Sequence, residues 1–341
     1  MKKFKYNIIF ISIVFALLLV YIFFIDDPKM LFAAVKSTKI APFIIAAVFM
    51  CLYWVFETLA QYFIIKSAET PLKFHQVLRV VMIGQLFNCL TPSATGGQPV
   101  QMYEMGKYGS SAGKSACVLL MRFLIYQAVM VFYSAVIILA KLSFFKDKVS
   151  NLAFISLIGF AVNAAVLVGL FLCCFFPKGF AKAANKFIMF LGKIKIIKNT
   201  KKITDKIDAE ISQFHTDFKA FSGKKAQLIM PAVFSFLQLT CFFIIPFFVC
   251  ECLGVKINPI NALCAAGFTF MISSFVPLPG GSGGAEGGFL LFFGSDFSAQ
   301  GKSVALAILL WRILTFYLPI VSGSIFSFIT NKKNKKPELS A

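Results

Sequence analysis

Long apolar runs are the feature that most limits what this chain can fold into. Six runs have the length and purity of membrane spans, and they cover residues 8–25, 42–65, 115–140, 151–176, 228–250 and 303–330. A helix needs about 20 apolar residues to cross the hydrocarbon core of a bilayer. Every backbone amide in that core must be paired within its own structure, which excludes irregular chain and open sheets. The runs therefore predict an all-α polytopic integral membrane protein with about six full spanning helices.

The charged residues support this class of protein. Only 14% of the residues are charged, although the formal net charge is +20, whereas soluble proteins average about 25% charged residues. Most lysines lie between the apolar runs, chiefly within residues 178–225, and at both ends. This placement is typical of cytoplasmic loops beside anionic lipid headgroups, and we predict no nucleic-acid partner. The cysteines and the two histidines suggest neither a metal site nor a disulfide framework, so no cofactor is predicted.

Two further apolar segments, 76–91 and 260–278, end in proline- and glycine-rich sequence and could either cross the membrane or turn back within it. If both turn back, the six spans place both termini and the basic 178–225 loop on one side, as the positive-inside rule requires. If both cross, that loop lies outside while the termini stay inside. We therefore predict two re-entrant segments within one transmembrane domain, residues 1–331. Both termini are expected in the cytoplasm of a bacterial cell, followed by a tail at 332–341.

The segment between the two halves has its own pattern. Apolar residues recur at steps of three and four between residues 200 and 223, with charged residues between them. This spacing predicts an amphipathic cytoplasmic helix. It would either lie on the membrane interface or pack against the cytoplasmic ends of the spans.

An internal repeat is the most informative pattern. The sequence Pro-x-x-x-Gly-Gly occurs at 92–97 and again at 279–284, an offset of 187 residues, and Gly-Lys-Ser follows at 113–115 and 301–303. Each copy precedes a span that carries one arginine. The first re-entrant segment would enter after the second span and the second after the fifth, from opposite faces. This order predicts an inverted repeat with halves near 42–140 and 228–330, as in many secondary transporters.

The two interrupted loops, 91–99 and 277–288, are the predicted centre of function. Non-helical backbone at membrane depth is tolerated where protein buries it or where it lines a water-filled cavity. Glycine amides followed by a helix N-terminus suit a phosphate group. The alternative is that these glycines only permit tight turns and close helix packing.

Ionisable and polar residues within the spans are further candidates. Arg122 and Arg312 lie in apolar runs, where a charge is functional by default. Each could bind a lipid phosphate, or pair with Glu104 and Glu286 as internal counter-ions. The first half is also rich in polar residues, and each glutamine taken singly is expected to hydrogen bond between helices; these residues are Glu57, Gln61, Arg79, Gln85, Asn88, Gln98, Gln101 and Gln127.

The run at 84–99, the second loop at 277–288 and Arg312 resemble the membrane domain of bacterial lysylphosphatidylglycerol synthase, also called multiple peptide resistance factor. The resemblance covers residues 5–330. It implies a flippase that moves aminoacylated phosphatidylglycerol to the outer leaflet, while a separate soluble domain makes that lipid. Since the chain ends at Ala341, we expect a stand-alone form without the synthase domain.

We therefore expect a flippase-like transporter of an anionic or aminoacylated phospholipid, such as lysylphosphatidylglycerol, that is not an enzyme by itself. The alternative is a phosphatidylglycerol lysyltransferase, or a subunit of one, contributing to cationic antimicrobial peptide resistance. The expected partners are phospholipid and membrane, with a homo-oligomer or a cytoplasmic lipid-modifying enzyme as further options. The candidate binding residues are Thr91, Pro92, Gly96, Gly97, Gln98, Glu104, Arg122, Pro279, Gly280, Gly281, Gly283, Gly284, Glu286 and Arg312.

Overall fold

The computed structural model of the chain describes residues 38–148, 226–273 and 278–328, with a few single positions outside these ranges. The described residues are helical and contain no strand beyond one isolated bridge. The first group of helices is α3 (Ile40–Ser67), α4 (Phe74–Leu90), α5 (Gly97–Gly106) and α6 (Ala112–Lys148). The second group is α10 (Ala226–Cys252), α11 (Pro259–Ser273), α12 (Gly284–Ala299), α13 (Val304–Arg312), a π-helical turn η1 (Ile313–Tyr317) and α14 (Leu318–Phe328). The prediction of an all-α protein is confirmed.

Four helical stretches are long and apolar enough to cross a bilayer. They are Ile40–Ser67, Ala112–Ile137, Gln227–Cys252 and Val304–Phe328, with mean hydropathy between 1.9 and 2.2. They correspond to four of the six predicted runs, and the chain is a polytopic membrane protein. The predicted spans at 8–25 and 151–176, the amphipathic helix at 200–223 and the tail at 332–341 lie outside the described ranges. The outer limits of the domain stay a prediction.

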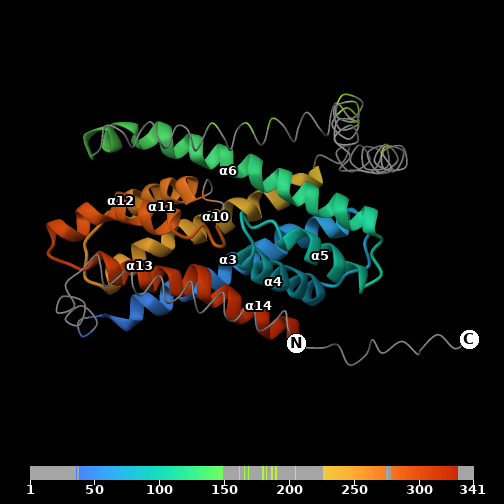
Figure 1. Cartoon of the computed structure of the whole chain (residues 1–341), viewed down its shortest axis with the longest axis horizontal. Coiled ribbons are helices and arrows are strands. Elements are labelled where there is room, and N and C mark those ends of the chain that lie inside the picture. The colour runs from blue at the N-terminus through green and yellow to red at the C-terminus, as the bar shows by residue number, and fades with distance from the viewer. Residues whose placement is uncertain are drawn as a thin grey trace, which may run out of the picture.

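The two ambiguous segments each form the first arm of a helical hairpin. Helix α4 packs against α5, and α11 packs against α12. The four helices have 17, 10, 15 and 16 residues, so each arm is about 15 to 26 Å long at 1.5 Å per residue. Each arm is thus shorter than the hydrocarbon core, which is about 30 Å thick. Figure 1 shows α4 and α5 toward one end of the molecule and α11 and α12 toward the other, while α3, α6 and α10 run along its length.

The hairpin tips meet at an antiparallel backbone bridge between Pro92 and Pro279. These prolines are counterparts in the sequence repeat, 187 residues apart. In a two-fold arrangement a residue faces its own counterpart only on the axis. The contact between these counterparts is the one expected for an inverted repeat, whose two-fold relation stays a prediction. The order of helices agrees, because α3, α4, α5 and α6 are followed by α10, α11, α12 and the α13–α14 span in the same sequence.

The backbone of the two loops matches at the two residues after each proline and differs at Gly96, with φ of −82°, and its counterpart Gly283, with φ of 85°. Ser93 and Ala94 have φ of 51° and 53°, and their counterparts Gly280 and Gly281 have φ of 62° and 61°. The N–H of Ala94 donates to the carbonyl of residue 91 at 3.2 Å, as that of Gly281 donates to the carbonyl of residue 278 at 2.9 Å. Left-handed backbone suits glycine and strains residues with a Cβ. The first loop therefore carries strain that the second loop avoids.

Packing anchors each hairpin to the spans. The second hairpin lies in the larger apolar core, where the rings of Phe289 and Phe293 on α12 stack with centroids 4.5 Å apart. A smaller core around Val77, Val80 and Met105 holds the first hairpin. Helix α14 then reaches across the repeat to α4, because Gly323 lies so close that an added Cβ would be 2.5 Å from the carbonyl oxygen of Met82. The two halves therefore support each other's hairpin.

Replacing Gly280 with alanine is expected to destabilise the protein. The new Cβ would sit in left-handed backbone and lie 2.2 Å from Cε2 of Phe316, a ring that is 2% exposed. Strain and overpacking together should lower the free energy of unfolding by about 2 to 4 kcal/mol. The measurement is thermal unfolding in detergent. Gly287→Ala is the matched control, because nothing lies within 4 Å of its added Cβ; equal effects of both variants would contradict the requirement for this turn.

Candidate functional site

A cavity with many polar side chains in its wall lies beside the first hairpin loop of this otherwise apolar protein. Its volume is about 340 Å³, and its wall includes Ser93 and Ala94 of the first loop. An adjoining cavity of about 390 Å³ shares these two residues and reaches Gly280 and Gly281 of the second loop. The two cavities share part of their wall and together adjoin both hairpin turns, as expected for interrupted backbone at membrane depth.

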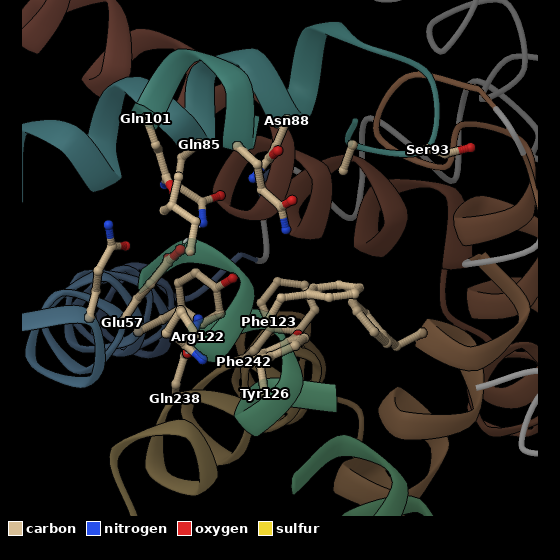
Figure 2. Close-up of a pocket in the computed structure, with 16 residues that line it drawn as sticks. Glu57, Gln85, Asn88, Ser93, Gln101, Arg122, Phe123, Tyr126, Gln238 and Phe242 are labelled. Atoms are coloured by element: carbon tan, nitrogen blue, oxygen red, sulfur yellow. Dashed lines mark hydrogen bonds between the residues drawn. The ribbon is translucent and has the colours of Figure 1, made fainter. Parts of the chain in front are cut away.

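Six carboxamide side chains line the first cavity and come from four helices. They are Gln61 on α3, Gln85 and Asn88 on α4, Gln98 and Gln101 on α5, and Gln238 on α10. We call this group the amide collar. Figure 2 shows Gln85, Asn88 and Gln101 on one side of the space and Arg122 and Gln238 on the other, while Gln85 reaches Glu57 at 2.6 Å. Such groups are costly in hydrocarbon unless they are hydrogen bonded, so their gathering in one place requires explanation.

Arg122 of α6 is the cation in the wall of this cavity. Its side chain is 8% exposed, and Nη1 donates to Oγ of Ser235 at 3.1 Å while Nη2 donates to Oε1 of Gln238. Its Nε is buried and has no hydrogen-bond partner among the described residues. The guanidinium also lies 5.3 Å from the centre of the Tyr126 ring. Arg122 is thus held by two partners, and neither hydrogen bond uses its Nε.

Glu57 of α3 supplies the negative charge in the same wall. One carboxylate oxygen accepts a hydrogen bond from Nε2 of Gln85 at 2.6 Å. Its charge interacts with that of Arg122, and Figure 2 shows both side chains reaching the same space. The first cavity therefore carries one positive and one negative charge, each held by a neutral amide.

Arg312 has a different environment on the opposite side. Its Nε donates to Oε1 of Glu286 at 2.6 Å, and Nη1 donates to the carbonyl oxygen of Gly280 at 3.0 Å. Oε2 of Glu286 in turn accepts the N–H of Gly283 at 2.7 Å. We call these four residues the second-loop clamp. Its ion pair is buried, with the arginine side chain 5% and the glutamate side chain 10% exposed, so it fixes the turn to α13.

The sequence left open whether each arginine pairs with an acidic residue of its own half, and the answer differs between the two arginines. The pairing of Arg312 with Glu286 is confirmed, and the corresponding pairing of Arg122 with Glu104 is wrong. Glu286 is the third residue of α12, whereas Glu104 lies near the end of α5, where it pairs with Lys107 at 2.5 Å. The position in the first half that matches Glu286 is Pro99, which has no charge. Glu104 and Glu286 follow the glycine pairs in the same order along the chain, but they do not occupy equivalent positions in the two hairpins.

The other candidate residues fall into two groups. Gln98, Arg122, Gly280, Gly281 and Arg312 line the cavities. Glu104 lies near the end of α5, away from both loops. The remaining residues lie in the loops; these are Thr91, Pro92, Gly96, Gly97, Pro279, Gly283, Gly284 and Glu286.

Close packing explains several of these loop residues. Oγ1 of Thr91 accepts the N–H of Gly96 at 2.8 Å. A Cβ on Gly97 would lie 2.0 Å from Oδ1 of Asn88, and one on Gly284 would lie 2.3 Å from Val276. At these positions the structural alternative, tight turns and close packing, accounts for the glycine.

Sequence reasoning singled out Glu57 and Gln61 of α3 but missed the residues that α10 contributes and the ring of Tyr53. Gln238, Ser235 and the rings of Tyr53 and Phe242 were not singled out, although Gln238 is a polar residue inside one of the most apolar runs. The other amides were noted but interpreted as contacts between helices. Counting polar residues by face, on each span, would have shown that they converge.

Comparison with known proteins gives two findings. The family described as the lysylphosphatidylglycerol synthase TM region matches residues 9–323. The UPF0104 membrane protein PH1989 of Pyrococcus horikoshii is 26% identical over 286 residues, which cover 80% of this chain and 81% of that protein. The name of that relative states a membrane protein and gives no activity.

Proposed function

Because the chain belongs to the family of lysylphosphatidylglycerol synthase transmembrane regions, we propose that it is a flippase-like transporter of an anionic or aminoacylated phospholipid. The observation that carries the proposal is the polar wall of the cavity beside the first loop, with a buried arginine whose Nε is not used by either of its hydrogen bonds. A lipid headgroup loses its water when it crosses the bilayer, and a buried charge is tolerated only where other groups replace that water. The cavity wall offers such groups.

The residues have different tasks in this proposal. The phosphate of the headgroup binds at Arg122, whose fork of donors matches phosphate oxygens, while the acyl chains stay in the bilayer. The amide collar binds the rest of the headgroup, with Gln98 at its edge. Gly280, Gly281 and Arg312 form the opposite wall, and the other loop residues position the two turns. The contact between Pro92 and Pro279 opens as one repeat moves against the other.

We place the protein in the bacterial cell membrane with both termini in the cytoplasm. The basic segment between the halves supports this orientation, since cytoplasmic loops are enriched in lysine. A homo-oligomer or a bound lipid-modifying enzyme is compatible with it.

Transbilayer movement of lipid is the direct test. The purified full chain is reconstituted into liposomes that contain fluorescent phospholipids, and quenching of the outer leaflet is followed over time. Label that starts in the inner leaflet should become accessible faster with the protein than in protein-free vesicles. Unchanged movement for every headgroup tried would overturn the flippase.

Lysyl transfer is the second candidate function, favoured by the name of the family. It predicts lysylphosphatidylglycerol in lipid extracts when this chain is expressed alone in a host that lacks the lipid. Extracts without it, from cells that express the chain well, would exclude transfer by this chain. In that case resistance to cationic antimicrobial peptides would depend on movement of lipid made elsewhere.

A further inference from the structure

Glu57 is the one acidic side chain among the described residues that line the first cavity. The carboxylate of Glu286, in the second-loop clamp, lies 2.6 Å from the guanidinium of Arg312. Glu57 instead accepts a hydrogen bond from the neutral amide of Gln85, and no ion pair joins it to another described residue. Its negative charge is therefore not neutralised by a cation in direct contact.

The depth of Glu57 in the membrane makes such a charge costly. Helix α3 has 28 residues, and Glu57 lies ten residues, from 57 to 67, before its end at Ser67. That distance is about 15 Å along the axis, or about half the thickness of the hydrocarbon core. A buried carboxylate without a cationic partner is neutralised by taking up a proton, and carboxylates within spans form the proton relays of pumps and transporters. Glu57 is thus placed to exchange a proton.

Arg122 is the cation that favours the ionised form of Glu57. The titratable groups whose charges interact with Glu57 are Tyr53 of α3, Cys89 of α4, and Arg122 and Tyr126 of α6. Phenols and thiols are ordinarily uncharged near neutral pH, and an opposite charge favours an ionised carboxyl group. Helix α10 faces the same cavity with the neutral Gln238, and Tyr317 of η1 interacts with the clamp instead.

An anion that binds Arg122 changes this balance. The guanidinium is held by Ser235 and Gln238, and Arg122 and Glu57 reach the same space (Figure 2). A bound anion cancels the positive charge that favours ionised Glu57 and adds a second negative charge to that space. Nearby like charges disfavour ionisation, so a proton on Glu57 restores neutrality. Binding of the anion and of the proton therefore favour each other, and this linkage is reciprocal.

We propose that Glu57 is a proton-binding site, and that one proton crosses the membrane with each anionic headgroup that binds Arg122. This inference rests on the proposed function and names the ion that moves with the lipid. The proton comes from water on one side, stays on a carboxyl oxygen of Glu57 while the headgroup occupies the cavity, and returns to water on the other side. Movement of a headgroup with one negative charge is then electroneutral, so a pH gradient drives it and a membrane potential does not.

The distribution of lipid under a pH gradient tests the proposal. The full chain is reconstituted in phosphatidylcholine vesicles that contain fluorescent phosphatidylglycerol, and potassium with valinomycin holds the membrane potential at zero. A gradient of about one pH unit should enrich the label about tenfold in the leaflet that faces the alkaline side, because one proton accompanies each anion. Protein-free vesicles give the background of slow movement.

Variants at residue 57 separate protonation from the hydrogen bond to Gln85. Glu57→Gln keeps an oxygen that can accept this bond but has no proton to exchange. It should move lipid without enrichment under the pH gradient, and its lipid distribution should respond to a membrane potential instead. Glu57→Asp keeps a titratable group and should restore part of the enrichment. Glu251→Gln is the matched control, since Glu251 lies near the end of α10, outside the cavity wall, and it should behave as the parent does.

The outcomes separate this inference from the proposed function. Even distribution of label by the parent under the gradient, or full enrichment by Glu57→Gln, overturns proton coupling and leaves the flippase intact. If either protein moves no lipid, proton uptake by the two purified chains in weakly buffered detergent decides the inference. Short-chain phosphatidylglycerol should cause the parent to take up about one proton per chain and Glu57→Gln to take up none. Equal uptake by both proteins, or no uptake by the parent, overturns the inference.

Discussion

Replacing Arg122 with methionine is expected to abolish lipid movement in reconstituted vesicles. The change removes the donor that we propose for the phosphate and leaves Ser235 and Gln238 without their hydrogen bonds to Arg122. Hydrogen bonds to charged groups contribute about 1.5 to 3 kcal/mol each, so the loss of two or more predicts a fall of 100-fold or more. The measurement is the initial rate of movement of the best lipid at equal amounts of folded protein.

A conservative variant separates binding from folding. Arg122→Lys keeps the positive charge that balances Glu57 but loses the planar fork. We expect it to fold as the parent does and to move lipid about 10- to 100-fold more slowly. Thermal unfolding in detergent confirms that each variant is folded before its rate is compared. A well-folded Arg122→Met protein with the parent's rate would remove Arg122 from the mechanism.

Breaking the second-loop clamp is expected to have the largest effect on stability. Removing one partner of a buried ion pair leaves an uncompensated charge and costs about 3 to 5 kcal/mol. Glu286→Leu should therefore unfold at a much lower temperature in detergent and give less folded protein. Adding Arg312→Met to the same chain removes the orphaned charge and should restore part of the lost stability.

A second ion pair of the chain provides the control. Lys107 and Glu104 also form an ion pair, but the lysine side chain is 43% exposed. Exposed pairs contribute at most about 1 kcal/mol, so Lys107→Met should change the unfolding temperature little. Similar losses for Glu286→Leu and Lys107→Met would show that the clamp is not buried in the membrane-embedded protein.

Much of the fold follows from the sequence because its signals are local. Length and apolar composition predicted the helices at 42–65, 115–140, 228–250 and 303–330, since the bilayer imposes both. The repeated proline and glycine motif predicted two equivalent turns, because a turn depends on a few neighbouring residues. The bridge between Pro92 and Pro279 is the structural counterpart of that motif.

The site depends on contacts that are distant in sequence, and it was predicted less well. Arg122 donates a hydrogen bond to Gln238, which lies 116 residues later in the sequence. No residue spacing within a single span predicts that contact. The order of residues along the chain suggested Glu104 as one alternative partner of Arg122, whereas the charge of Glu57 on another helix interacts with it. The packing of the helices determines which of these residues pair. The sequence of one half does not indicate which residue of the other half is the partner.

The bridge between Pro92 and Pro279 also has a consequence for the membrane around the protein. Prolines have no N–H, so any hydrogen bonds of this bridge come from the residues beside them. In the proposed transporter this contact must open for a headgroup to pass, and it would also be the barrier to ion leakage. The size and duration of its opening would then set how much of the cell's ion gradient is lost for each headgroup that passes.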